Sequence, residues 1–498
     1  MFRISDKLQL LGSHYVSQAV RIMATLAMAR LLTPEDYGFV ALVLTLPGFF
    51  GSLGDFGVGR CIVQFRDADE RQLLDTGFVL SLILRGGTAL LTLASGAWLA
   101  NHYNQPALLW VGVIYAANTM LVAVYQFQLA CLSRRMAFAL EARQMLIMAG
   151  AQAATGLVLA FSGFGVFALA FQALAAQLAA NAFLWRAQPL RAPTRVRGAM
   201  VRRYLVMGWK ITAASYTDKV KANILNAVVA FFGGATALGL IGRGTQVRDL
   251  FLHNTLTSFD RLLYPIFSNN QKDPARLREV FLRGERAVCL LAFLGTAGLM
   301  ATAPDLIRVM LGPQWAEVPP LLVALAPSVA FTGVMLPAIT LMLATGQPTV
   351  WLRYNLLYLL LFTPAIVLAG AYGLEPLCWA TTGAYAVIAL MEWRWVLRHL
   401  GTGVGEACRD IAVLFLSAAA SYLAMIGVNA AAERWLVLPR FLVSGAAGVA
   451  VFAGLVWLFD KETVRELQAL IQRKPKPAPA DHPEPTEPGP ADSDSQSA

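Results

Sequence analysis

The sequence predicts an all-α protein that crosses a membrane many times, through about 14 transmembrane helices. Hydrophobic residues make up 57% of its 498 residues, and charged residues make up only 14%. Soluble domains carry about a quarter charged residues. The mean hydropathy is +0.57. The apolar residues also gather in segments of about 20, the length that a helix needs to cross the hydrocarbon core. The chain therefore belongs in a membrane.

The apolar segments fall into two sets of six and a final pair. The first set is expected at 11–32, 37–60, 74–100, 107–130, 141–162 and 164–186. The connection AQPLRAPTRVRGAMVRRY follows, in which Pro189 and Pro193 disfavour helix. The second set is expected at 204–232, 236–265, 286–312, 317–345, 349–370 and 374–397, and the pair at 410–430 and 437–459. Most connections are short, so they leave no room for a soluble catalytic domain, and the protein is not expected to be an enzyme.

This order predicts an N-terminal lobe over 1–195, a C-terminal lobe over 196–400 and an additional helix pair over 401–460. Both lobes begin with a polar-faced span, a second span and a basic segment, which is QFRDADERQ in one and NNQKDPARLRE in the other. This likeness indicates a pseudo-two-fold repeat with a substrate path between the halves. The tail over 461–498 is rich in proline and polar residues, so it is expected to be disordered.

Basic residues are concentrated in alternate connections. The connections poor in lysine and arginine are TPEDYG, NHYNQP, SGFG, FGGAT, LGPQWAE, AYGLEP and NAAAERWLVLP. Cytoplasmic loops carry an excess of Lys and Arg, so the basic set is expected in the cytoplasm, together with both termini. This distribution also accounts for the net charge of +10 and gives no reason to expect a nucleic-acid partner.

Arg21 stands near the middle of the first span, where a charge is costly and usually faces a cavity. His14, Gln18, Arg21 and Thr25 are spaced four, three and four residues apart, which stacks them on one helix face. Two interpretations remain open. The stripe either lines a water-filled cavity, or forms a hydrogen-bonded seam with Arg21 neutralised by an acid.

Other charges also fall inside the expected spans. Among the charges singled out in the first, third, seventh and eighth spans, the cations outnumber the acids by eight to three: Arg21, Arg85, Lys210, Lys219, Lys221, Arg243, Arg248 and Arg261 against Asp218, Asp249 and Asp260. We expect Lys210, Asp260 and Arg261 to reach the membrane surface. The excess predicts an anion-binding cavity, in which arginine gives bidentate contacts and lysine a point charge. The candidate substrate-binding residues are Arg21, Arg85, Lys219, Arg248, His14 and Gln18.

Asp218 and Asp249 are candidates for carrying a coupling ion, although each stands beside a cation and is equally well read as its partner. The five cysteines are far apart, with no CxxC pair and no neighbouring histidine: Cys61, Cys131, Cys289, Cys378 and Cys408. The sequence therefore predicts no metal site and no cofactor.

Four stretches resemble one family of membrane transporters. They are ARLLTPEDYGFVAL, LGDFGVGRCIVQ, RLLYPIFSNNQKDPARLRE and APDLIRVMLGPQWAEVPPLL, and they occur in the family's order over nearly the whole chain up to about residue 400. The chain is similar to the Wzx-type polysaccharide flippases of the multidrug/oligosaccharidyl-lipid/polysaccharide exporter superfamily, and the LGPQW segment is similar to the exopolysaccharide branch. Physically these motifs are turns and helix ends, and Trp315 is expected as an anchor at the membrane surface.

The resemblance implies a function. Members move an undecaprenyl-pyrophosphate-linked oligosaccharide across the bacterial inner membrane, by alternating access of two lobes around a central cationic cavity. It implies the lipid-linked oligosaccharide and membrane lipids as partners, together with the polysaccharide polymerase and export machinery. The pair of spans after residue 405 is absent from many twelve-helix members, so its role is open.

Two alternatives share the superfamily. A lipid II flippase also carries an anionic lipid, whereas a multidrug exporter would favour acidic and aromatic residues that hold cationic drugs. A membrane glycosyltransferase would need catalytic carboxylates, a histidine or a large outer loop. The outer connections are too short, and the five histidines form no cluster in the sequence.

Overall fold

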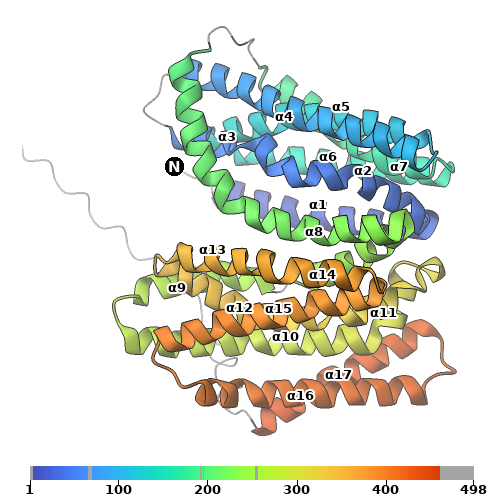
Figure 1. Cartoon of the computed structure of the whole chain (residues 1–498), viewed down its shortest axis with the longest axis vertical. Helices are drawn as coiled ribbons and strands as arrows, with labels where there is room; N and C mark the ends of the chain where they lie inside the picture. Colours follow the sequence, from blue (N-terminus) through green and yellow to red (C-terminus); the bar gives the residue numbers. More distant parts are fainter. Residues whose placement is uncertain (1–3, 66–69, 191–192, 194–195, 253–255, 460–498) are drawn as a thin grey trace, which may run out of the picture.

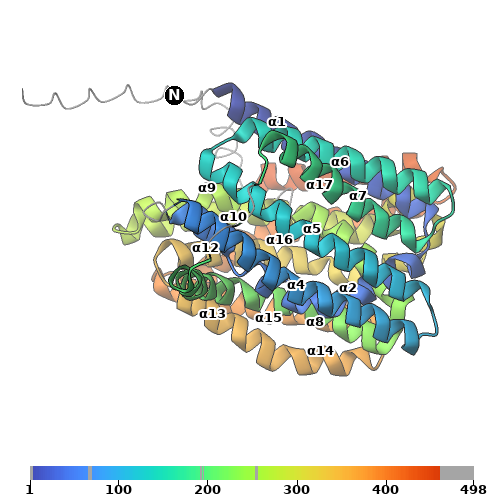
Figure 2. The same cartoon turned by 90° about the horizontal axis from the view of Figure 1, so that it is seen from above.

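The computed structural model describes residues 4–65, 70–190, 193, 196–252 and 256–459, and every regular element in these ranges is a helix. The first group of helices comprises α1 (Ile4–Leu31), α2 (Pro34–Asp55), α3 (Val58–Gln64), α4 (Glu70–His102), α5 (Ala107–Arg135), α6 (Phe138–Phe161) and α7 (Val166–Ala187). Within this group, α6 lies beside both α1 and α7 (Figure 2).

A long helix, α8 (Gly198–Phe251), leads into the second group. That group comprises α9 (Thr257–Asn270), α10 (Pro274–Met310), η2 (Pro313–Trp315), α11 (Val318–Leu325), α12 (Pro327–Ala344), α13 (Pro348–Leu357), η3 (Tyr358–Phe362), α14 (Thr363–Gly370) and α15 (Leu374–His399). The final pair is α16 (Val404–Ala431) and α17 (Val437–Phe459). The two groups form two layers, with α8 between them (Figure 1).

The 54 residues of α8 exceed what one crossing needs, because about 20 helical residues already span the hydrocarbon core. The helix breaks at Gly234, whose φ of 68° and ψ of −158° are not helical. Glycine tolerates a positive φ because it has no Cβ. This break lies in the predicted FGGAT connection, so α8 provides two antiparallel spans.

With α8 counted twice, and with α3, α9 and the paired short helices joined to their neighbours, the described chain forms 14 crossing segments, as predicted. Eleven helices in the described ranges are long and apolar enough to span by length and composition alone. The segments that this criterion misses are α1, α2 and the part of α8 before Lys219. Polar residues such as Gln18 and Arg21 lower the mean hydropathy of α1, and the first part of α8 contains several charged residues.

The connection between α1 and α2 is a capped helix start. The Thr33 hydroxyl donates to the Asp36 carboxylate at 2.8 Å and accepts a hydrogen bond from the Asp36 backbone N–H at 3.3 Å, while the Thr33 N–H donates to the same carboxylate at 3.0 Å. This reciprocal pattern satisfies backbone donors that a helix end leaves free. Pro34 fits the first helical position, where no donor is needed. The TPED motif therefore fixes where α2 begins.

The first part of α8 packs against the first group. The Tyr204 hydroxyl donates to the backbone oxygen of Leu73 on α4 at 2.9 Å, and both residues belong to a buried cluster with Ile62 on α3. The lobe boundary near residue 195 stays a prediction, because α8 makes contacts with both groups.

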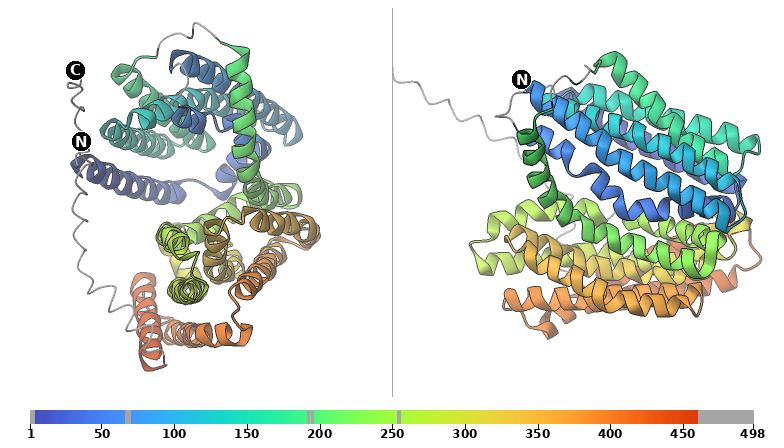
Figure 3. Two further views of the ribbon diagram at one scale, coloured as in Figure 1. Left: turned by 90° about the vertical axis from the view of Figure 1, so that its left-hand side faces the viewer. Right: turned by 45° about the horizontal axis from the view of Figure 1, so that its top comes forward.

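The final pair packs on the far side of the second group from the first group, where it is drawn in red in Figure 3. The Arg440 guanidinium on α17 makes a bidentate ion pair with the Asp305 carboxylate on α10. The Asn429 side chain on α16 donates to the backbone oxygen of Ala301 at 2.9 Å. These contacts attach the pair to α10.

Candidate functional site

The polar face of α1 lines a cavity at its border with α8. Gln18, Arg21 and Thr25 contribute to a cavity of about 260 Å³, opposite Gln246 and Leu250 on the second part of α8. His14 is exposed and is not among the residues that line this cavity. The cavity therefore joins a residue stripe from the first group to a helix that leads into the second.

A second cavity, of about 480 Å³, lies among α2, α3, α4, α5 and α8. Its charged lining residues are three cations and one acid: Arg60, Arg85, Lys219 and Asp55. Asp55 is close enough to Arg85 for electrostatic attraction. The two cavities share none of their lining residues. The structure thus brings the candidates Arg85 and Lys219 together, and it puts Arg21 in a different cavity.

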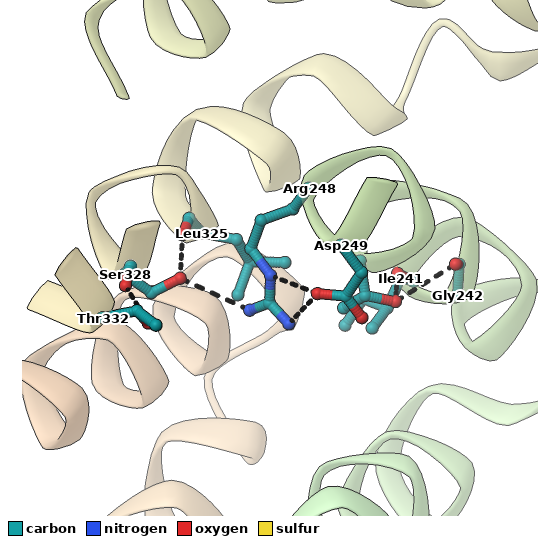
Figure 4. Close-up of polar contacts among 8 residues, drawn as sticks. Ile241, Gly242, Arg248, Asp249, Leu325, Ser328 and Thr332 are labelled. Atoms are coloured by element: carbon teal, nitrogen blue, oxygen red, sulfur yellow. Dashed lines mark hydrogen bonds and ion pairs between the residues drawn. The ribbon is translucent and has the colours of Figure 1, made fainter. Parts of the chain in front are cut away.

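Arg248 forms an ion pair with its neighbour Asp249 and a hydrogen bond to Ser328 on α12 (Figure 4). Its Nε and Nη2 donate to Asp249 Oδ1 at 3.0 and 2.8 Å, and its Nη1 donates to the Ser328 hydroxyl at 3.4 Å. Arg248 retains 12% of its side-chain exposure and Asp249 39%. Asp249 therefore neutralises this cation in the conformation described. The side chain of Asp218, the other proposed ion carrier, lies outside the described residues.

Both cavities are suited to anions by their charged groups. A guanidinium presents a planar fork that matches phosphate or carboxylate oxygens, and an ammonium adds a flexible point charge. In the described ranges, no group of three or more His, Cys, Asp or Glu side chains could hold a metal ion. The charged side chains of these cavities are of the kind that can bind a negatively charged group.

The two helix groups are tied together where α1 ends. The Trp315 Nε1 on η2 donates to the backbone oxygen of Ala29 at 2.8 Å, and the Gln314 amide donates to the same oxygen at 2.7 Å. Trp315 is fully buried, with 0% exposure. The expectation of a membrane-surface anchor was therefore wrong for Trp315, because the indole finds its hydrogen-bond partner inside the protein. We call the contacts around Ala29, Tyr37, Arg243 and Trp315 the Trp315 seam.

Tyr37 on α2 lies at the centre of the Trp315 seam. Its ring centroid is 5.7 Å from that of Trp315, and the Arg243 Cζ lies 3.8 Å above its ring. The helices approach closely there because of glycine. A Cβ on Gly38 would lie 1.8 Å from the backbone oxygen of Ala235, and one on Gly239 would lie 1.9 Å from that of Pro34. The backbones of α2 and α8 touch at this point.

The sequence prediction missed four residues of these sites: Asp55, Arg60, Tyr37 and Gln246. The LGDFGVGR motif contains the signal for two of them, because its glycines interrupt the helix between Asp55 and Arg60. Both charges fall at the end of the expected span 37–60 and were not among the candidates, whereas they line the second cavity. No local pattern distinguishes Tyr37 or Gln246, which depend on the packing of distant helices.

Curated proteins of polysaccharide synthesis are similar to this chain. The "Teichuronic acid biosynthesis protein TuaB" of Bacillus subtilis is 23% identical over 417 residues, covering 81% of this chain and 84% of that protein. The "Succinoglycan biosynthesis transport protein ExoT" of Rhizobium meliloti is 23% identical over 471 residues, covering 90% and 92%. The "Lipopolysaccharide biosynthesis protein WzxC" of Escherichia coli is 23% identical over 357 residues, covering 69% and 70%.

Solved structures share the fold. The "Lipid II flippase MurJ, inward closed conformation" has a TM-score of 0.74 at 11% identity, covering 92% of this chain and 100% of that chain. An inward-facing MATE multidrug transporter of the MOP superfamily has a TM-score of 0.61 at 15% identity, covering 76% and 94%. The identity is low, so these likenesses concern the fold alone.

The family model described as "Polysaccharide biosynthesis protein" matches residues 27–320, which is more than half of the chain. That range includes α2, all of α8 and the Trp315 seam. The chain is a multi-pass membrane protein, and it belongs to this polysaccharide biosynthesis protein family.

Proposed function

We propose that this protein moves undecaprenyl-pyrophosphate-linked oligosaccharides from the cytoplasmic to the outer leaflet of the bacterial inner membrane, for exopolysaccharide or lipopolysaccharide synthesis. The observation that carries the proposal is the cavity in which Arg21, at the middle of α1, meets the second part of α8. A cation at this depth is energetically costly and usually marks a transport path. An anionic headgroup is its natural ligand. The names of the relatives support saccharide cargo.

The transport problem explains why such cavities are useful. A pyrophosphate with its sugars cannot cross about 30 Å of hydrocarbon unaided, while the lipid tail can remain in the bilayer. Arg21 in one cavity and Arg85 with Lys219 in the other would replace part of the hydration that the headgroup loses. The binding must stay weak enough for release on the opposite side.

Alternating access would use the Trp315 seam as its outer closure. The seam lies where α2 begins, beside a connection that is poor in basic residues and therefore outer by the charge distribution. In this proposal the headgroup enters from the basic, cytoplasmic side while the seam is closed. The seam then opens and the cytoplasmic side closes. Both termini stay in the cytoplasm, and the polymerase would receive the product outside.

The lining charges favour this cargo over a cationic drug. The second cavity has three cations and one acid among its described lining residues. An excess of lining cations over acids would repel a cationic drug. Lipid II is also anionic, and the fold likeness to its flippase does not identify the cargo. The relatives named for teichuronic acid, succinoglycan and lipopolysaccharide favour a polysaccharide repeat unit.

A complementation experiment tests the proposal. Cells that lack the protein should accumulate lipid-linked oligosaccharide on the cytoplasmic side and secrete less polysaccharide. The wild-type protein should restore both quantities, and Arg21→Ala at the same protein level should not. His14→Ala is the matched control, since His14 is exposed on the same helix. Unchanged lipid-linked oligosaccharide and polysaccharide in the deletion strain would refute the proposed cargo.

A further inference from the structure

Arg243 is an arginine with unused hydrogen-bonding capacity. Its Nε and Nη1 are buried and have no hydrogen-bond partner. Its contact in the Trp315 seam is with a ring, since its Cζ lies 3.8 Å from the Tyr37 centroid. No ion pair between Arg243 and an acid is present within the described part of the chain. A π-face attracts the cation but accepts none of its in-plane N–H groups as a carboxylate would.

Arg243 connects the Trp315 seam to the face of α8 that lines the Arg21 cavity. Gln246, Val247 and Leu250 line that cavity, and they follow Arg243 by three, four and seven residues along α8. These spacings put all four residues on one helix face. A group that leaves Arg21 along this face toward the seam therefore meets Arg243 next.

We propose that Arg243 is a second anion-binding residue, which Tyr37 covers in this conformation and which holds the diphosphate of the cargo after the Trp315 seam opens. This inference rests on the proposed function for its cargo. Tyr37 belongs to α2 in the first group, while Arg243 belongs to the second part of α8. Separation of the two groups removes the ring together with the packing that buries Nε and Nη1, and it opens the fork of the guanidinium to two phosphate oxygens.

This arrangement couples binding to opening. The Arg243 Nε and Nη1 are buried in this conformation, so a diphosphate reaches them only after the Trp315 seam has opened. A ligand that binds one of two conformations more tightly shifts the population toward that conformation. Diphosphate at Arg243 therefore favours the open seam, and its release lets Tyr37 cover the guanidinium again.

Cysteine labelling of the full-length purified protein tests this inference with inorganic pyrophosphate as the probe. Four native cysteines are buried and Cys408 is exposed, so Cys408→Ser gives the parent protein. Ala29→Cys places a reporter in the Trp315 seam, because Ala29 has 0% exposure and becomes accessible when the seam opens. Leu32→Cys, at a position with 3% exposure, is a second reporter if the first variant folds poorly. The rate of maleimide labelling is measured with and without pyrophosphate.

We expect pyrophosphate to raise the labelling rate of the parent several-fold. Arg243→Gln should abolish this response, and Arg243→Lys should retain part of it, since lysine keeps the charge and loses the fork. Arg434→Gln is the control, because Arg434 is exposed in the connection between α16 and α17 and should respond as the parent does. An equal pyrophosphate response in Arg243→Gln and its parent, or no response in the parent, would overturn the inference.

The failure of this inference is distinguishable from failure of the proposed function. The deletion strain reports on the cargo and does not involve Arg243. If that strain accumulates lipid-linked oligosaccharide while Arg243→Gln responds to pyrophosphate like its parent, the cargo is right and the role of Arg243 is wrong. If deletion changes nothing while Arg243→Gln loses the response, the anion-binding residue stands and the cargo is a different anionic group.

Discussion

The indole nitrogen of Trp315 donates a 2.8 Å hydrogen bond to the backbone oxygen of Ala29, across the border between the two helix groups. One group supplies the donor from η2, and the other supplies the acceptor in the last turn of α1. The bond is buried at both ends, since each residue has 0% exposure. The closed state of the Trp315 seam thus depends on contacts that must break when the groups separate.

Truncation of Trp315 should be costly for the folded protein. We expect Trp315→Ala to lower the free energy of unfolding by about 3–5 kcal/mol, because it removes a large buried side chain. Trp315→Phe should cost about 1 kcal/mol through the lost hydrogen bond. Denaturant unfolding of the detergent-purified protein measures both changes. Trp457→Ala is the control, since Trp457 is 64% exposed on α17. Equal losses at the two tryptophans would contradict the packing role of Trp315.

Gly239 allows α2 and α8 to close together. A Cβ at this position would lie 1.9 Å from the Pro34 backbone oxygen, so Gly239→Ala must push the helices apart. We expect faster maleimide labelling of the Ala29→Cys reporter in this variant, without any ligand. Gly242→Ala is the matched control on the same helix, because its Cβ would meet no atom within 4 Å. If both alanine variants label at the rate of their parent, the close contact does not keep the seam closed.

The Arg440–Asp305 ion pair should hold the final helix pair in place. The two side chains retain 19% and 5% exposure, so the removal of one partner leaves a poorly hydrated charge. We expect Arg440→Ala or Asp305→Ala to cost about 3–5 kcal/mol. The double variant should cost clearly less than the sum of the two, as a double-mutant cycle of unfolding measures. Additive losses would mean that the two side chains do not stabilise each other.

Arg248 should contribute to the stability of the protein, whereas Arg21 should contribute to transport. Because Asp249 neutralises Arg248, the double variant Arg248→Leu with Asp249→Leu removes both partners and should keep most transport activity. Arg248→Leu alone should lower stability more than the double variant does, since it leaves Asp249 without its cation. Arg21→Ala should abolish transport with normal expression. Polysaccharide secretion and protein level in the complemented deletion strain measure both effects. A double variant that is well expressed yet inactive would make this pair part of the transport path.

The sequence was informative wherever a local pattern decides the structure. The 14 spans follow from apolar length and from breaks such as Gly234, and the α1 stripe follows from helical spacing, because both depend on neighbouring residues alone. The sequence identified the candidate cations by their residue type, but it could not predict which of them share a cavity. Arg85 and Lys219 meet only because α4 and α8 pack with particular rotations, and the same holds for Tyr37 and Arg243.

Where the structure differs from the sequence prediction, the cause is contact with helices that are distant in the sequence. The sequence of LGPQW is compatible with an indole at the membrane surface, and nothing in it indicates that the end of α1 covers Trp315. Likewise, the adjacency of Arg248 and Asp249 allowed either a free proton carrier or an ion pair. The position of the guanidinium between Asp249 and Ser328 depends on α12.

The central claim is that this chain flips a diphosphate-linked saccharide with Arg21 in its path, and a reconstituted assay tests it most directly. Vesicles containing the purified protein and undecaprenyl-pyrophosphate-linked oligosaccharide would be treated with a membrane-impermeant glycosidase. We predict that vesicles with the wild-type protein or His14→Ala expose nearly all of the saccharide over time. Vesicles with Arg21→Ala should expose only the fraction that starts in the outer leaflet. Equal exposure with and without the wild-type protein would contradict the claim.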